Sequence, residues 1–201
     1  MTYSFISYTS DSVTDAEFDQ LETFLSESVQ LNEPASVNMF WEPQGLLHNI
    51  HAKLRWRTDQ GRIYLILKDN RPIGVSCVEY PEGSQQFAIG GIRTYLDTAN
   101  RGAGAVGAVL EQQTVWAQEH GCQFMIVTFN GYNRVAHTAV GLSAKYRRAA
   151  GWSPWWDDCY AVPEPLNIRH TMQWVVVKPI QLNTEMTEKC QVLVDWANKY
   201  Q

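Results

Sequence analysis

A glycine-rich turn between a predicted strand and a predicted helix constrains this chain more than any other segment. The turn, residues 100–107, follows a β-like run over residues 87–96 and opens a helical run over residues 105–120. Its small residues leave the first amides of the helix uncovered by side chains, and those amides have no partner within the helix. The helix dipole adds positive potential at the same end. The segment therefore predicts a site for a phosphate or diphosphate, with close helix–sheet packing as the structural alternative.

Spacing discriminates between the ligands that such a turn could hold. A Walker A loop ends in Gly-Lys-Ser/Thr, and no such triplet occurs in the chain. Gly102, Gly104 and Gly107 do form Gly-x-Gly-x-x-Gly, the fingerprint of dinucleotide-dependent oxidoreductases. That fingerprint requires its first glycine directly after the strand and an acidic residue about 20 positions later. Here the polar residues 97–100 intervene, and the next predicted strand, 124–129, ends without an acid, so the oxidoreductase hypothesis is disfavoured.

Residues 101–106, Arg-Gly-Ala-Gly-Ala-Val, resemble the Arg/Gln-x-x-Gly-x-Gly/Ala loop of the GNAT superfamily, the acyl-CoA-dependent N-acyltransferases. The order of elements over residues 63–152 is similar to the central region of that family: a tight hairpin, a strand, the loop, a helix, a strand and a second helix. The closing pair, Gly151-Trp152, is similar to the family's Gly-Phe. The resemblance implies an α/β fold with a mixed, mostly antiparallel central sheet flanked by helices. It also implies transfer of an acetyl group from acetyl-CoA to a primary amine of a small molecule or polypeptide.

The sequence departs from the family pattern at two informative positions. Val106 stands where the family usually has glycine or alanine, and Tyr146 lies five residues before Gly151, where the family's tyrosine lies four before. Val106, the absence of an obvious catalytic base and the additional C-terminal helix leave an alternative function open: a catalytically silent, GNAT-like module that binds acyl-CoA or acts by interaction.

The resemblance assigns the acetyl-CoA contacts mainly to main-chain groups of two segments. One segment would face the diphosphate, and the other would face the pantetheine arm and the thioester oxygen. The contacts fall on Arg101, Gly102, Ala103, Gly104, Ala105 and Val106 in the first segment and on Thr94, Tyr95 and Leu96 in the second. Asn133 stands where the family has an asparagine beside the coenzyme arm, and a helix N-cap explains this residue equally well.

Two side chains are candidates for proton transfer. An alkyl amine with a pKa of about 10 must lose a proton before it can attack a thioester. Glu79, at the end of a predicted strand over residues 72–80, is the nearest carboxylate in the core region and the candidate base; a solvated strand-end residue is the alternative. Tyr146 is the candidate acid for the leaving CoA thiolate, and an ordinary core tyrosine is the alternative.

Aromatic residues beside carboxylates suggest a cationic, amine-bearing acceptor. Trp41 is followed by Glu42, and Trp155-Trp156 are followed by Asp157-Asp158. Aromatic faces and carboxylates together suit an ammonium group, whereas tryptophans that simply fill the core are the alternative. No metal is expected as a cofactor.

The whole chain is consistent with one domain of 201 residues, subdivided into N-terminal helices (1–60), an acyl-CoA-binding core (61–152) and C-terminal strands with a helix (153–201). A net charge of −5 argues against nucleic acid as a partner, and no apolar run is long enough to span a membrane. Four scattered cysteines without a Cys-x-x-Cys pair indicate reduced thiols in a cytoplasmic protein. A homodimer is compatible with the sequence.

Periodicity predicts the remaining elements. An amphipathic helix over residues 15–30 begins at a capping box, Thr14 to Glu17. Further helices are predicted over residues 45–56, 134–150 and 185–200, and a last strand over residues 172–177. The helix over residues 185–200 is an addition to the family pattern, and we expect it to cover a sheet edge or an oligomer contact.

Overall fold

An eight-stranded sheet forms the centre of the computed structural model, which describes residues 2–9, 12–32, 60–81, 86–101, 104–130, 135–168 and 171–180. The strands, in chain order, are β1 (Tyr3–Tyr8), β2 (Gly61–Lys68), β3 (Arg71–Glu79), β4 (Phe87–Leu96), β5 (Phe124–Asn130), β6 (Tyr160–Ala161), β7 (Leu166–Ile168) and β8 (Thr171–Pro179). The helices of the described residues are α1 (Asp15–Asn32), α3 (Ala105–Glu119), α4 (Val135–Val140) and α5 (Ala144–Ala149), with short 3-10 turns η2 (Thr98–Asn100) and η3 (Pro154–Trp156).

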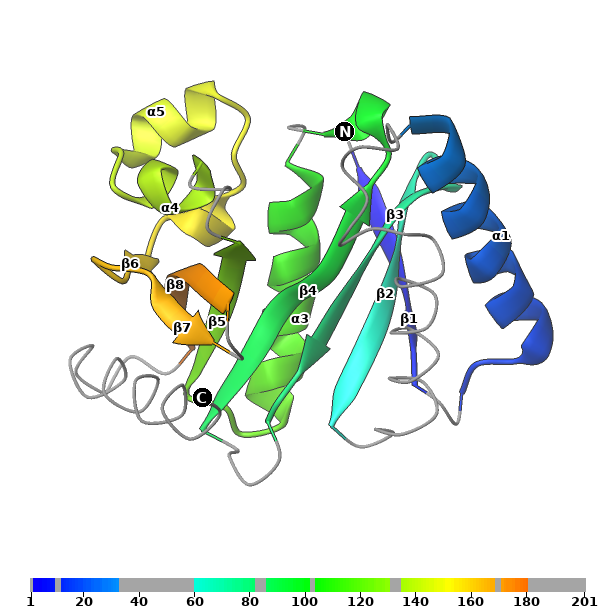
Figure 1. The fold of residues 1–201 in the computed structure, drawn as a ribbon, viewed down its shortest axis with the longest axis horizontal. Coiled ribbons are helices and arrows are strands. Elements are labelled where there is room, and N and C mark those ends of the chain that lie inside the picture. The colour runs from blue at the N-terminus through cyan, green and yellow to red at the C-terminus, as the bar shows by residue number, and fades with distance from the viewer. Residues whose placement is uncertain are drawn as a thin grey trace.

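The sheet is mixed and mostly antiparallel, as predicted. Its strand order is β1-β2-β3-β4-β5-β8-β6, and β7 pairs with β8. The β4–β5 ladder is parallel, and the other ladders between described strands are antiparallel. A parallel pair requires a crossover connection, which α3 provides (Figure 1). This arrangement is not the doubly wound parallel sheet of dinucleotide-binding proteins, which further weakens the oxidoreductase hypothesis.

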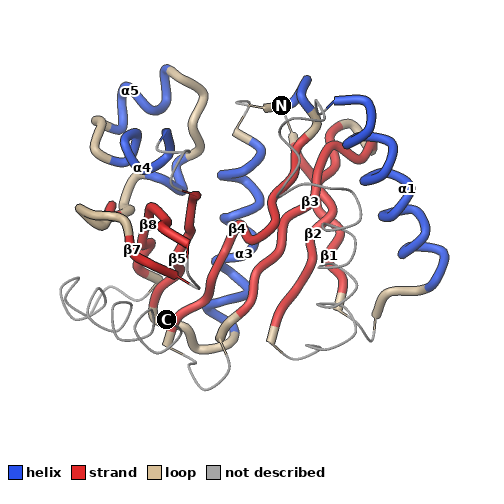
Figure 2. Tube along the Cα trace, viewed as in Figure 1, coloured by secondary structure: helices blue, strands red, loops and turns tan. Residues whose placement is uncertain are grey.

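Helices cover both faces of the sheet (Figures 1 and 2). α1 packs on one face, where its Leu21 joins a buried cluster with Leu65 of β2. α3 packs on the other face, where its Leu110 and Ile66 of the same strand belong to a second buried cluster, the α3 cluster. Successive side chains of a strand point to opposite faces, so β2 must be apolar at consecutive positions to serve both layers. The continuous apolar run over residues 63–67, from which the sequence predicts this strand, is explained by burial on both faces.

Two local signals of the sequence have the structure they predict. The hairpin between β2 and β3 turns at Asp69 and Asn70, whose φ angles of 52° and 60° match a two-residue type I′ turn. At the start of α1, the Thr14 amide donates to Glu17 Oε2 at 2.9 Å, and the Glu17 amide donates to Thr14 Oγ1 at 3.3 Å. The hydrogen bond from the Thr14 amide holds the pKa of Glu17 below its ordinary value. The predicted capping box is confirmed.

The single helix predicted over residues 134–150 is wrong, because the chain forms α4 and α5 with a break between them. The amides of Gly141 and Leu142 donate back to the carbonyls of Thr138 and Ala139, which closes α4 in a tight turn. Ser143, with φ −63° and ψ 150°, is extended and begins α5. The two short helices therefore meet at an angle instead of forming one rod (Figure 1).

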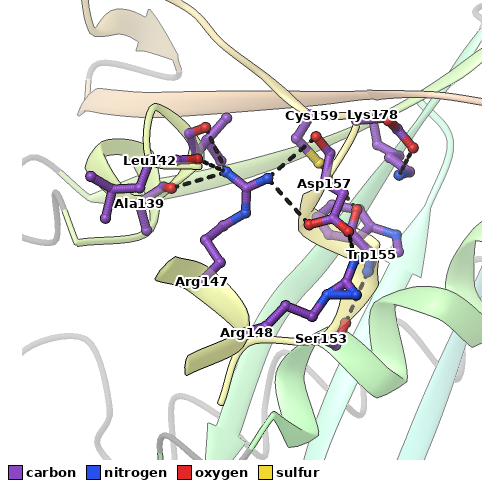
Figure 3. A network of polar contacts seen from close by, with 11 residues as sticks. Ala139, Leu142, Arg147, Arg148, Ser153, Trp155, Asp157, Cys159 and Lys178 are labelled. Atoms are coloured by element: carbon purple, nitrogen blue, oxygen red, sulfur yellow. Dashed lines mark hydrogen bonds and ion pairs between the residues drawn. The ribbon is translucent and has the colours of Figure 1, made fainter. Parts of the chain in front are cut away.

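The guanidinium group of Arg147 holds this break together (Figure 3). Its Nη1 donates to three carbonyl oxygens at the end of α4, those of Ala139 at 3.3 Å, Val140 at 2.9 Å and Leu142. Its Nη2 lies 3.2 Å from Asp157 Oδ1, and Asp157 also pairs with Arg148. Burial opposes ionisation of Asp157, but the hydrogen bonds and positive charges of the two arginines outweigh it and hold the pKa of this carboxyl below its ordinary value.

The remaining differences from prediction concern three short strands and the ends of β8. β1, β6 and β7 are strands that periodicity does not reveal, and β8 extends beyond the predicted strand at both ends. The helices predicted over residues 45–56 and 185–200 lie outside the described residues. None of the helices in the described ranges is both long and apolar enough to cross a membrane.

The cysteines of the described residues are reduced thiols, as predicted. Cys77 and Cys122 are buried, and Cys159 is partly buried. Burial raises the pKa of Cys122 to about 11 and that of Cys159 to about 12. These two thiols are therefore protonated and unreactive at neutral pH.

We expect Gly107→Ala to destabilise the protein by about 2 kcal/mol, although glycine to alanine in a helix interior usually gains about 1 kcal/mol. A Cβ at this position would lie 2.3 Å from Ser153 Oγ, 2.6 Å from Ser153 Cβ and 3.1 Å from Trp156 Nε1. Ser153→Gly removes the two nearest atoms, so the double variant should recover most of the loss. Urea denaturation of the four proteins of this cycle measures the coupling. If the effects of the two single substitutions on the free energy of unfolding were additive, residue 107 of α3 and Ser153 before η3 would not be in contact.

Candidate functional site

The parallel strands β4 and β5 part before they end. Their ladder runs from the Phe87–Phe124 pair to the Gly90–Val127 pair. Beyond that pair, β4 continues to Leu96 along β3, and β5 continues along β8. Figure 1 shows the two strand ends diverging, with α3 behind them. In the described ladders, the facing edges of residues 91–96 and 128–130 thus carry main-chain groups that do not pair with each other.

Two β-bulges bend β4 where it leaves β5. Along β3, Val75, Cys77 and Glu79 pair with Tyr95, Ile92 and Ile89 of β4. Every two residues of β3 therefore face three residues of β4, so β4 carries an extra residue twice. The first of these lies beside Gly91, whose φ of +67° is in the left-handed region that favours glycine. Gly91 thus allows the backbone of β4 to bend at this point.

The N-terminus of α3 lies after the carboxyl end of β4. Gly104 is its N-cap at φ 83°, and this glycine has no side chain with which to cap the helix. The first intrahelical bond runs from the Ala108 amide to the Gly104 carbonyl at 3.0 Å. The amides of residues 105–107 precede that bond and point out of the helix end, where they can donate to an anion.

The glycines of the turn have different roles. Gly104 needs its left-handed backbone, and a Cβ there would lie 3.0 Å from the Gly151 carbonyl oxygen. Gly107 is required by packing, because Ser153 and Trp156 fill the space beside it. Gly102 and Ala103 lie outside the described residues, as does the predicted coenzyme contact Asn133. The packing and anion-binding interpretations of the turn therefore apply to different glycines.

Arg101 and the end of β4 line the same turn. The Arg101 Nε donates to the Leu96 carbonyl at 3.1 Å, and the guanidinium lies 6.0 Å from the centroid of the Tyr95 ring. Tyr95 and Leu96 are buried, and the Thr94 hydroxyl is used inside the protein, where it donates to the Gly91 carbonyl at 2.7 Å. Any ligand contact of Tyr95 and Leu96 would thus be made by the main chain. Ala105 is buried, and Val106 packs partly against the α3 cluster.

Glu79 lies near the start of the gap between β4 and β5. It pairs with Ile89, two positions before Gly91, and its side chain is 5% exposed. Val75 and Cys77 belong to the cluster beneath α1, and Glu79 follows them at the same alternation. Its carboxylate therefore projects from the α1 face, about 17 Å along β3 from Gly74, the partner of Leu96.

Tyr146 and Arg147 take opposite directions on α5. The Tyr146 side chain is 70% exposed, whereas Arg147 is 5% exposed and points into the break between α4 and α5 (Figure 3). Arg147 is also the residue that lies four positions before Gly151. The exposed position of Tyr146 gives no support to its predicted role as an acid, which stays a prediction.

The tryptophan–aspartate segment already contains a cation of the chain itself. Trp155 and Trp156 are each 4% exposed and pack edge to face, with ring centroids 4.8 Å apart. Lys178 Nζ lies 5.8 Å from the Trp155 ring centroid and 3.6 Å from Asp158 Oδ2. The combination of an aromatic face and a carboxylate is present as predicted, but Lys178 occupies it. This segment therefore gives no support to a cationic acceptor, and Trp41 and Glu42 lie outside the described residues.

Comparison with known proteins finds matches in structure but none in sequence. No protein-family model matches the chain, and no curated protein matches it in sequence. An acetyltransferase assigned to the GNAT family, from Desulfovibrio desulfuricans, aligns over 89% of this chain and 99% of its own, with a TM-score of 0.55 and 11% identity.

Two further matches carry more specific names. The ribosomal-protein-S18-alanine N-acetyltransferase from Escherichia coli aligns over 92% of this chain and 97% of its own, with a TM-score of 0.54 and 10% identity. The PaiA N-acetyltransferase from Thermoplasma acidophilum, solved in complex with coenzyme A, aligns over 89% and 99%, with a TM-score of 0.53 and 11% identity. Identities this low establish shared architecture and leave the chemistry open. The chain has the fold of the GNAT acetyltransferases.

Proposed function

We propose that the protein is an acyl-CoA-dependent N-acyltransferase that transfers an acetyl group from acetyl-CoA to a primary amine of a small molecule or polypeptide. One observation carries this proposal: a helix N-terminus whose N-cap is a glycine lies after the carboxyl end of β4, one of two parallel strands that part. The helix end supplies donors for a diphosphate, and the parting strands leave a β4 edge that does not pair with β5 and can run beside an extended arm. A ligand with a diphosphate and an extended, amide-containing arm matches both.

In this proposal the main chain of the protein makes most of the contacts to the coenzyme. The amides of residues 105–107 hold the diphosphate, and the edge of β4 over residues 92–96 runs alongside the pantetheine arm. An amide near the bulges would donate to the thioester oxygen as negative charge develops there during attack. Holding the two substrates together in the reactive orientation contributes several kcal/mol more.

Glu79 stays our candidate for the base. Its carboxylate projects from the face of the sheet that α1 covers, two positions before the residue where β4 leaves β5. An amine approaching the thioester from that face would lose its proton to Glu79 directly or through a water molecule. Glu79→Gln should then lower kcat while the affinity for acetyl-CoA is retained.

A silent acyl-CoA-binding module is the second candidate. The outward direction of Tyr146 and the inward direction of Arg147 favour it, because the candidate acid does not project into the protein. Such a module would bind the coenzyme without turnover.

Ligand titration followed by an activity assay separates these functions. Acetyl-CoA at 100 times its Kd should raise the melting temperature by roughly 5–10 °C, whereas S-acetylpantetheine, which lacks the diphosphate, should have little effect. Release of free CoA thiol in the presence of a panel of primary amines would support the transferase, and stabilisation without thiol release would support the silent module. Stabilisation by NADH and none by acetyl-CoA would contradict both.

A further inference from the structure

A buried ring of hydrogen bonds joins α3 to the bend in β4. The Gly91 amide donates to Gln113 Oε1 at 2.8 Å, and Gln113 Nε2 donates to Ser76 Oγ at 2.9 Å. The Thr94 hydroxyl donates to the Gly91 carbonyl at 2.7 Å. Ser76 Oγ and Thr94 Oγ1 lie 2.8 Å apart, and because the Thr94 proton is already used, Ser76 is the donor between them. The ring thus closes on both main-chain groups of Gly91.

Every polar group in this ring has its partner inside the protein. Gln113 and Ser76 are 0% exposed, so water cannot replace a lost bond without entering the core. The orientation of the Gln113 amide is fixed as well, since only its oxygen can accept from the Gly91 amide. All bonds run in one direction around the ring, an arrangement in which each bond polarises the next.

The ring lies at the place where the two parallel strands part. Gly91 directly follows Gly90, the last residue of β4 that pairs with β5, and Thr94 lies beside the second bulge. A Cβ on Gly90 would come within 2.8 Å of Met125 Sδ and 3.1 Å of Gln113 Oε1. The absence of a side chain at Gly90 therefore gives Gln113 access to the strand, and the ring includes residues at both bulges.

We infer that Gln113 is a positioning residue that fixes the bend of β4 and thereby holds the strand edge over residues 92–96 away from β5. In the proposed function, on which the second half of this inference rests, that edge receives the pantetheine arm. Gln113 itself lies behind the strand and touches no substrate. It acts through Gly91 and Thr94.

The direct test is amide hydrogen exchange in the protein without ligand. In Gln113→Met, which keeps the length of the side chain but removes both polar groups, the Gly91 amide should exchange at least tenfold faster than in the wild type. Amides of the β4–β5 ladder over residues 87–90 should stay protected. Gln112→Met is the matched control, because Gln112 is exposed on the same helix and should change neither. Unchanged exchange at Gly91 in Gln113→Met would overturn the inference.

The functional test uses two ligands that share the diphosphate. Gln113→Met should weaken acetyl-CoA binding about tenfold but leave unchanged the affinity for adenosine 3′-phosphate 5′-diphosphate, the half of the coenzyme without the arm. An equal loss for both ligands would show general damage and contradict a positioning role. Ser76→Ala breaks the same ring from β3 with a smaller change of volume, so it should reproduce both results if Gln113→Met does not fold.

Failure of the proposed function gives a different pattern. If the wild-type protein bound neither ligand, the coenzyme would not be its ligand and the proposed function would fail. The exchange rate of the Gly91 amide would still decide whether Gln113 holds the bend of β4.

Discussion

The Val106→Glu protein should bind acetyl-CoA at least tenfold more weakly than the Val106→Gln protein, although its helix α3 is the more stable of the two. Val106 is the second residue of α3, where a negative side chain interacts favourably with the helix dipole by about 0.3–1 kcal/mol. The same charge about 5 Å from a bound diphosphate costs on the order of 2 kcal/mol, even in the high effective dielectric of a protein surface. The two effects of one charge have opposite signs.

Glutamate and glutamine form a matched pair at this position. Both remove the partial packing of Val106 against the α3 cluster, so that loss cancels when the two variants are compared. Calorimetric titration gives the affinities, and thermal unfolding without ligand gives the stabilities. The difference in affinity should also shrink as salt is added, because the helix end is near solvent. Equal affinities at low salt would mean that the diphosphate is not held at this helix end.

Substitution of Gly104 would be a weaker test of the same site. Its φ of 83° and the Gly151 carbonyl 3.0 Å from an added Cβ strain any other residue there. Lost binding in a Gly104 variant could therefore come from a distorted turn as easily as from a blocked ligand. Val106, which departs from the motif, is therefore a more informative position for testing ligand binding than Gly104, which the motif emphasises.

The sequence predicts elements well where one local cause decides them. The type I′ turn at Asp69-Asn70 and the capping box at Thr14 are set by the conformational and hydrogen-bonding preferences of a few adjacent residues. The continuous apolar run of β2 follows from its burial between two helix layers. Local signals are sufficient for strands β2 to β5 and β8 and for the strand–turn–helix that carries the candidate site, but they do not reveal β1, β6 and β7.

Features that depend on distant partners are not visible in the same way. The break between α4 and α5 depends on Arg147, whose partner Asp157 follows ten residues later, so helical periodicity alone predicts one continuous helix. One signal of Gln113 is present in the sequence: this polar residue interrupts the apolar stripe of α3 between Val109 and Trp116. A polar residue in such a stripe needs a buried partner, but nothing local says that the partners are Gly91 and Ser76.

Arg147→Ala should lower the free energy of unfolding by about 3 kcal/mol, whereas Arg148→Ala, on the next residue, should cost less than about 1 kcal/mol. Both side chains are bonded to Asp157, but Arg148 is 50% exposed and Arg147 is 5% exposed. Removal of Arg147 also leaves the carbonyl groups at the end of α4 without their charged donor, and a hydrogen bond to a charged group is worth more than a neutral one.

The pair of variants distinguishes a buried brace from a surface ion pair. In thermal unfolding, Arg147→Ala should melt roughly 6–12 °C below the wild type, and Arg148→Ala within a few degrees of it. Arg147→Lys keeps the charge but cannot reach the α4 carbonyls and Asp157 together, so it should recover only part of the loss. If Arg147→Ala and Arg148→Ala were equally stable, the bonds to α4 would contribute nothing, and the break between the two helices would require a cause other than Arg147. If Arg147→Lys matched the wild type, charge alone would account for the stabilisation, since the forked geometry of the guanidinium would then be dispensable.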